Sequence, residues 1–155
     1  MKKRIISHSS KETQSFAKKL AKNIGKYKPK KGALILALEG DLGGGKTTFL
    51  QGFAQGLGIK EKILSPTFVI MRKFKIRVDS CSDSCGFVYF YHVDCYRIQK
   101  QKEILDLGWK EIIKNPRNII AVEWAEKISK ILPKKKVKIK FKFVNKNTRL
   151  LTINV

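Results

Sequence analysis

Residues Gly40–Thr47 read Gly-Asp-Leu-Gly-Gly-Gly-Lys-Thr, which matches the pattern G-x-x-x-x-G-K-[ST]. The glycines allow positive φ angles and remove Cβ atoms, so backbone N–H groups can converge on phosphate oxygens. Lys46 is then expected at the β- and γ-phosphates of a nucleoside triphosphate, and the Thr47 hydroxyl at Mg²⁺. The nucleotide-contacting residues predicted from this stretch are Asp41, Leu42, Gly43, Gly44, Gly45, Lys46, Thr47 and Thr48.

The sequence on both sides of this loop supplies the structural context that a phosphate-binding loop needs. The apolar run Ala33–Leu38 lies between Gly32 and Gly40 and predicts a strand buried on both faces. Residues 47–57 carry apolar residues at helical spacing and predict a helix that begins at the loop. This context favours a phosphate site over the alternative, a simple glycine-rich turn.

The remaining elements predict a single α/β domain over residues 1–155. The pattern Ser9-x-x-Glu12 is a capping box, and the helix after it should end near Gly25. Alternating residues in the tail predict a half-buried strand with a lysine face, a turn at 145–148 and a returning strand. The other predicted elements are an antiparallel hairpin of residues 68–76 and 87–93, a helix over 103–113 interrupted by Gly108, and a strand over 119–122. Together they predict a three-layer fold with a mixed parallel and antiparallel sheet and a C-terminal hairpin.

Two of the predicted strands end in an acid. Asp94 follows the strand that ends at Val93, and Glu123 follows the strand that ends at Val122. A hydrophobic strand followed by a carboxylate is typical of the acid that holds magnesium beside a phosphate-binding loop, directly or through water. The residues alone do not rank the two acids, and a strand-terminal acid that caps a turn is the alternative for each.

The chain is strongly basic, with 34 Lys plus Arg against 12 Asp plus Glu and a formal net charge of +22. Such a field favours nucleic acid, acidic protein surfaces or anionic lipid as partners. The alternative is a general lysine bias that decorates every exposed face. No apolar run is long enough for a membrane span or a signal peptide, so a soluble, cytoplasmic protein with reduced cysteines and no membrane partner is expected.

Two other classes of phosphate-loop protein fit the sequence less well. A GTPase would need an N-K-x-D segment, and residues 145–148 read Asn-Lys-Asn-Thr, without the acid that reads guanine. A turn with two asparagines is the better interpretation. A small-molecule kinase usually carries an arginine-rich lid, whereas the arginines of residues 72–149 lie far apart.

Several blocks together resemble the TsaE (YjeE) ATPase family. In chain order they are GDLGGGKTT at 40–48, SPTF at 65–68, YHVDCYR at 91–97, LGW at 107–109 and VEWAE at 122–126. The resemblance implies a part in the bacterial machinery that forms N6-threonylcarbamoyladenosine at position 37 of ANN-decoding tRNAs. It also implies ATP and Mg²⁺ as ligands and the TsaB–TsaD heterodimer as partner, with tRNA contacted directly or through that complex.

The resemblance also implies roles for residues outside the loop. Thr67 is similar to a switch residue near the γ-phosphate, and Asp94 to the acid needed for hydrolysis. Glu123 is similar to the second acid around the metal, which would also involve Thr47, and Trp124 to a residue bordering the nucleotide or the partner. Weaker matches near the adenine are Thr13 and Arg149.

These observations predict an ATP-driven switch that hydrolyses ATP slowly by itself, because no arginine finger is evident in the sequence. Two alternatives remain at this point. One is a basic nucleic-acid-binding module that uses ATP only for stability, which the net charge of +22 motivates. The other is a small-molecule kinase, which would transfer phosphate to an acceptor other than water.

Overall fold

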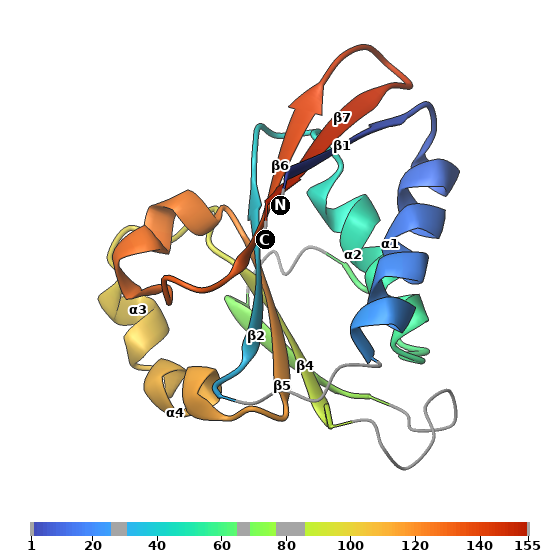
Figure 1. Cartoon of the computed structure of the whole chain (residues 1–155). Coiled ribbons are helices and arrows are strands. Elements are labelled where there is room, and N and C mark those ends of the chain that lie inside the picture. The colour runs from blue at the N-terminus through green and yellow to red at the C-terminus, as the bar shows by residue number, and fades with distance from the viewer. Residues whose placement is uncertain (1, 26–30, 65–68, 77–85, 155) are drawn as a thin grey trace.

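The computed structural model describes residues 2–25, 31–64, 69–76 and 86–154, and it confirms the predicted α/β fold with a mixed sheet (Figure 1). The sheet has seven strands in the order β1-β7-β6-β2-β5-β4-β3. The central strands β6, β2, β5 and β4 are parallel, and β3, β7 and β1 are added antiparallel. The strands are β1 Lys2–Ser7, β2 Leu34–Glu39, β3 Met71–Lys75, β4 Tyr89–Asp94, β5 Asn118–Glu123, β6 Val137–Phe143 and β7 Arg149–Asn154.

Helices cover the two faces of the sheet unequally. The long helices α1 (Ser10–Gly25) and α2 (Lys46–Gly56) lie on one face, where Leu36 and Leu38 of β2 enter a large aromatic core. The short helices α3 (Lys102–Leu105), α4 (Trp109–Lys114) and η2 (Ala125–Ile131) lie on the other face. There Ile35 and Ala37 enter a second core with residues of β4 and β5. Strand β2 is therefore buried on both faces, as the apolar run predicted.

The start of α1 confirms the predicted cap with one change. Ser9 Oγ accepts from the backbone N–H of Glu12 at 3.1 Å. The Glu12 carboxylate accepts from the backbone N–H of His8 at 2.7 Å, one residue earlier than in the standard capping box. The two side chains thus accept from backbone N–H groups that have no acceptor within the helix.

The sequence did not predict β1 and η2, and the structure adds detail to the predicted interruption at Gly108. Strand β1 has only two apolar residues, and it is held at the sheet edge by antiparallel pairing with β7, a partner far away in sequence. The 3-10 helix η2 has too short a pattern to recognise. The predicted interruption at Gly108 is real, because this glycine has φ +76° and separates α3 from α4.

Helices α1 and α2 cross at close range because α2 presents glycines to α1. A Cβ atom at Gly52 would lie 2.2 Å from the carbonyl oxygen of Gln14, and one at Gly56 would lie 2.6 Å from the Cβ of Ala21. These contacts are with backbone or with a rigid methyl group, so a side chain there must push the helices apart. The position of α2, and with it the phosphate loop, depends on this contact.

We therefore expect Gly52→Ala to lower the free energy of unfolding by about 1–3 kcal/mol, the usual range for overpacking. Urea denaturation gives this value directly. The matched control is Gln55→Ala on the exposed side of α2, expected to change stability by less than about 0.5 kcal/mol. Equal urea midpoints for Gly52→Ala and the unaltered chain would contradict the close crossing.

Candidate functional site

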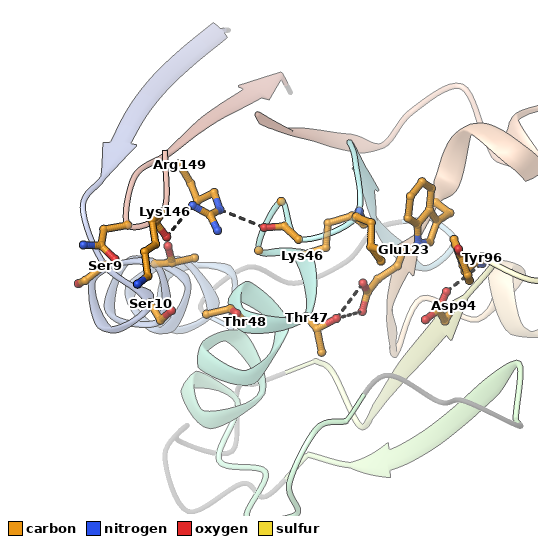
Figure 2. A pocket seen from close by; sticks show the side chains of 17 residues that line it. Ser9, Ser10, Lys46, Thr47, Thr48, Asp94, Tyr96, Glu123, Lys146 and Arg149 are labelled. Atoms are coloured by element: carbon orange, nitrogen blue, oxygen red, sulfur yellow. Dashed lines mark hydrogen bonds between the residues drawn. The ribbon is translucent and has the colours of Figure 1, made fainter. Parts of the chain in front are cut away.

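A cavity of about 400 Å³ opens where β2, β4 and β5 end and α2 begins (Figure 2). It lies at the carboxyl ends of parallel strands, where α/β sheets usually bind ligands, and its volume is within the range of small-molecule sites. The residues that line it are Ser9, Ser10, Thr13, Leu42, Gly43, Gly44, Gly45, Lys46, Thr47, Thr48, Asp94, Tyr96, Glu123, Trp124, Lys146, Asn147 and Arg149.

The loop before α2 has the backbone shape that its glycines predict. Gly43 and Gly45 have φ of +73° and +95°, a region that side chains rarely allow. Gly40 passes so close to β6 that a Cβ atom there would lie 2.2 Å from the carbonyl oxygen of Phe141. Gly45 is the N-cap of α2, and no side chain caps this helix. The first N–H groups of α2 are therefore directed at the cavity without a side-chain acceptor, which is the arrangement that binds phosphate.

Lys46 is folded back over its own loop. Its Nζ donates to the carbonyl oxygens of Gly40 and Asp41 at 2.5 and 2.8 Å, and it lies 4.0 Å from the ring centroid of Trp124. Burial lowers the pKa of Lys46, although the nearby Glu123 and three further carboxylates act in the opposite direction. The charged ammonium is thus held by weak neutral acceptors and an aromatic face, so an anion in the cavity would be a stronger partner.

A chain of hydrogen bonds connects α2 to the sheet through an acid. Thr47 Oγ1 donates to the Glu123 carboxylate oxygens at 3.1 and 3.0 Å, and Figure 2 shows the two side chains facing each other. His92 Nε2 lies 2.8 Å from Oε1 of the same carboxylate. Both partners in the second contact are buried, with exposed fractions of 0% for His92 and 3% for Glu123. The carboxylate is therefore fixed in direction.

The second acid stands at the end of the neighbouring strand. Asp94 lines the cavity, and its Oδ1 accepts from the backbone N–H of Tyr96 at 2.9 Å. Asp94 and Glu123 are register partners across β4 and β5, so the two carboxylates lie at the same sheet edge. The Tyr96 ring is 5.1 Å from the Trp124 ring, and Trp124 itself has a positive φ of 58°, which is costly for a bulky residue. That backbone turn holds the indole over Lys46.

The opposite end of the cavity is formed by β7 and the 145–148 turn. Arg149 Nε donates to the Gly43 carbonyl at 3.1 Å, and its Nη1 donates to backbone carbonyls of the turn, including Asn145 at 2.7 Å. The turn itself is confirmed, since Asn145 Oδ1 accepts from the N–H groups of residues 147 and 148. Thr13 is 2% exposed, and its hydroxyl is 2.8 Å from Ser7 Oγ, so it also ties α1 to β1.

The structure gathers most of the predicted site residues around one cavity. Asp41 is the exception among the described residues. It does not line the cavity, and its backbone carbonyl accepts a hydrogen bond from Lys46. Thr67 lies outside the described residues. Sequence reasoning missed Ser9, Ser10, Tyr96, Lys146 and Asn147, which line the cavity, and His92, which supports Glu123.

The donor set suits Mg²⁺ only together with a nucleotide. Within the described ranges, no group of three or more His, Cys, Asp and Glu side chains converges to hold a metal. Mg²⁺ in phosphate sites typically needs few protein ligands, because phosphate oxygens and water complete its shell. The hydroxyl of Thr47 and the carboxylate of Glu123, about 3 Å apart, provide oxygen ligands of the right kind.

Two observations concern the rest of the chain. No helix in the described part is long and apolar enough to cross a membrane. Burial raises the pKa of the Cys95 thiol to about 12, so this cysteine is a core residue and not a reactive thiolate.

Comparisons with known proteins agree on one family. Residues 7–151 match the family model TsaE, described as threonylcarbamoyl adenosine biosynthesis protein TsaE. A relative from Bacillus subtilis named tRNA threonylcarbamoyladenosine biosynthesis protein TsaE is 39% identical, covering 76% of this chain and 67% of its own. A protein of the same name from Rickettsia prowazekii is 34% identical, covering 95% and 91%. The crystal structure of YdiB from Bacillus subtilis superposes with a TM-score of 0.70 and 29% identity, covering 99% of this chain and 84% of that one.

Proposed function

This chain belongs to the TsaE family of threonylcarbamoyl adenosine biosynthesis proteins, and from that premise we propose that it is an ATP hydrolase that drives tRNA threonylcarbamoylation. One observation supports the proposal above all others. The uncapped start of α2, the Lys46 ammonium, the Thr47 hydroxyl and two strand-terminal carboxylates surround a single cavity of about 400 Å³. This is the minimum set for positioning a triphosphate and a water molecule.

The contacts of each residue indicate its role in the proposed reaction. The N–H groups at the start of α2 bind phosphate oxygens, and Lys46 moves its ammonium from two carbonyl oxygens to the phosphates. Mg²⁺ bound there would supply positive charge to neutralise the phosphate oxygens. Thr47 and Glu123, which are already hydrogen-bonded to each other, would hold Mg²⁺, and Asp94 would orient the attacking water. Thr67 is the proposed switch residue.

Slow hydrolysis by the isolated chain is part of the proposal. Among the residues that the structure describes, Arg149 is the arginine that lines the cavity. Its guanidinium donates to backbone carbonyls of the loop and of the 145–148 turn. Arg149 stands at the end of the cavity away from Asp94 and Glu123, so it is not placed beside the phosphoryl group on which the two acids act (Figure 2). We propose that the TsaB–TsaD heterodimer supplies the missing organisation, in the cytoplasm, and that ATP binding and hydrolysis switch its state during modification of ANN-decoding tRNAs.

The experiment compares ATP turnover by the chain alone, with TsaB–TsaD, and with TsaB–TsaD plus tRNA. The proposal predicts slow release of phosphate by the isolated chain and a change in rate on assembly. Product analysis must find phosphate transferred to water. Transfer to a small acceptor would instead identify a kinase, and equal rates under all three conditions would contradict the coupling.

His92 provides a sharper test of the acid that it supports. His92→Leu removes the contact with Glu123 and leaves a buried carboxylate with one partner fewer, so turnover in the assembled system should fall by roughly tenfold. His92→Gln keeps an N–H donor at similar reach and should restore most of the rate. ATP affinity should change little in both variants, because His92 does not line the cavity. Equal loss in both variants would mean that His92 serves packing alone.

A further inference from the structure

Strand β6 presents a row of lysines that the nucleotide site does not use. Alternation along the strand puts Lys138, Lys140 and Lys142 on one face, opposite the core residues Ile139 and Phe141. Successive lysines on this face are spaced by roughly 6.7 Å along the strand. The row therefore forms a line of positive charge that ends near the 145–148 turn.

The same face continues across the two neighbouring strands. The register pairs Lys138 and Lys140 of β6 with Asn154 and Thr152 of β7, which pair in turn with Lys2 and Arg4 of β1. Lys2 and Arg4 are exposed, and the residues between them and β6 are polar. We call the following five cationic residues the basic face: Lys2, Arg4, Lys138, Lys140 and Lys142.

No helix of the described chain packs over the basic face. The core beneath α3, α4 and η2 takes its strand residues from β2, β4 and β5 and none from β1, β6 or β7. Figure 1 shows the same arrangement, with α1 and α2 beside the other face of β6, β7 and β1. This half of the sheet thus has two layers instead of three. Its solvent side carries the cations and, in the row of Lys142, also Leu150 and the exposed Ile6.

The charge of this face is almost unopposed. Strands β1, β6 and β7 contain no acidic residue. The neighbouring acid Glu39 of β2 pairs with Lys138 at 2.7 Å and neutralises that lysine. Four cations of the face remain without an acidic neighbour in their own three strands, so the local field is strongly positive.

We propose that the basic face binds the phosphate backbone of tRNA, an inference that rests on the proposed function for the identity of the RNA. Lysine and arginine contacts to phosphates supply most of the affinity for nucleic acids. Protein interfaces are instead depleted of lysine, which argues against a protein partner here. Since β6 leads into the turn whose Lys146 and Asn147 line the cavity, RNA on this face lies next to the nucleotide.

The test measures fluorescence anisotropy of a labelled, unmodified transcript of an ANN-decoding tRNA with the full chain. In Lys140→Gln/Lys142→Gln, affinity at about 0.1 M salt should fall roughly 25-fold, and the slope of log K against log salt should shrink by about 1.4–1.8. The matched control is Lys19→Gln/Lys22→Gln on the exposed side of α1, which changes the net charge equally and should bind nearly as well as the unaltered chain.

Three results would overturn the proposal. Equal weakening in both double variants would show attraction by net charge alone. Absence of binding at low salt would show that the face does not bind RNA. If Lys140→Gln/Lys142→Gln binds tRNA normally but binds TsaB–TsaD more weakly, the basic face is a protein interface. ATP turnover is measured on the same samples. A chain that binds tRNA as expected but does not hydrolyse ATP would refute the proposed function without contradicting RNA binding by the basic face.

Discussion

Lys46→Ala is expected to weaken ATP binding by about 100-fold or more. The ammonium is the only cationic group of α2's first turn, and its charge-assisted hydrogen bonds to phosphate oxygens correspond to about 3 kcal/mol. Isothermal titration with ATP and Mg²⁺ measures the loss. The control is Lys60→Ala, an exposed lysine beyond the end of α2, which should bind ATP with unchanged affinity.

The same variant separates binding from folding. Burial lowers the pKa of Lys46, so its charged form is disfavoured in the folded protein without nucleotide. For a lysine with a lowered pKa, the unfolded state holds more protons, and the stability penalty is present at neutral pH and disappears as pH rises toward 10.5. The unfolding temperature of Lys46→Ala without ATP should therefore remain near that of the unaltered chain, while the rise caused by ATP disappears. A variant that unfolds early and still gains stability from ATP would contradict this account.

Glu123→Gln is expected to reduce ATP turnover in the assembled system by about 100-fold while ATP affinity changes less than about tenfold. Glutamine keeps the size of the side chain and one acceptor for Thr47, so the buried contacts largely persist. The lost negative charge should also raise the Mg²⁺ concentration needed for half-maximal rate. Phosphate release measured across a Mg²⁺ series gives both effects.

Asp94→Asn provides the matched comparison, because both acids end neighbouring strands at the same edge. It should reduce turnover with little change in the Mg²⁺ requirement, since Thr47 contacts Glu123 and not Asp94. If Asp94→Asn shifts the Mg²⁺ requirement and Glu123→Gln does not, the roles of the two acids are reversed. Normal turnover by Asp94→Asn would remove it from the mechanism.

The sequence predicted the parts of the site that depend on local pattern. A glycine-rich loop between an apolar run and an amphipathic helix needs no information from elsewhere, so the succession of strand, loop and helix around Lys46 and Thr47 followed directly. The acids Asp94 and Glu123 were predicted for the same reason, because each directly follows a short, mostly apolar run in the sequence. The start of α1 was also correct, because the Ser9-to-Glu12 spacing is local.

Contacts between distant segments were not predictable. His92 lies two residues before Asp94, which puts both on one face of β4, yet its bond to Glu123 requires the pairing of β4 with β5 in one particular register. Strand β1 likewise exists because β7 offers it an edge. The second role of the 145–148 turn, as a wall of the cavity beside Arg149, depends on where the C-terminal hairpin joins the sheet.

In the function proposed here, the loop before α2 binds a triphosphate through its backbone amides, one ammonium and one hydroxyl. Titration calorimetry of the folded chain with ATP and Mg²⁺ tests it most directly. Saturable heat with one ATP per chain is expected for the unaltered protein, and no such heat for Lys46→Ala at the same concentrations. If well-folded protein gives no heat with ATP or ADP, alone or with TsaB–TsaD, the claim is wrong.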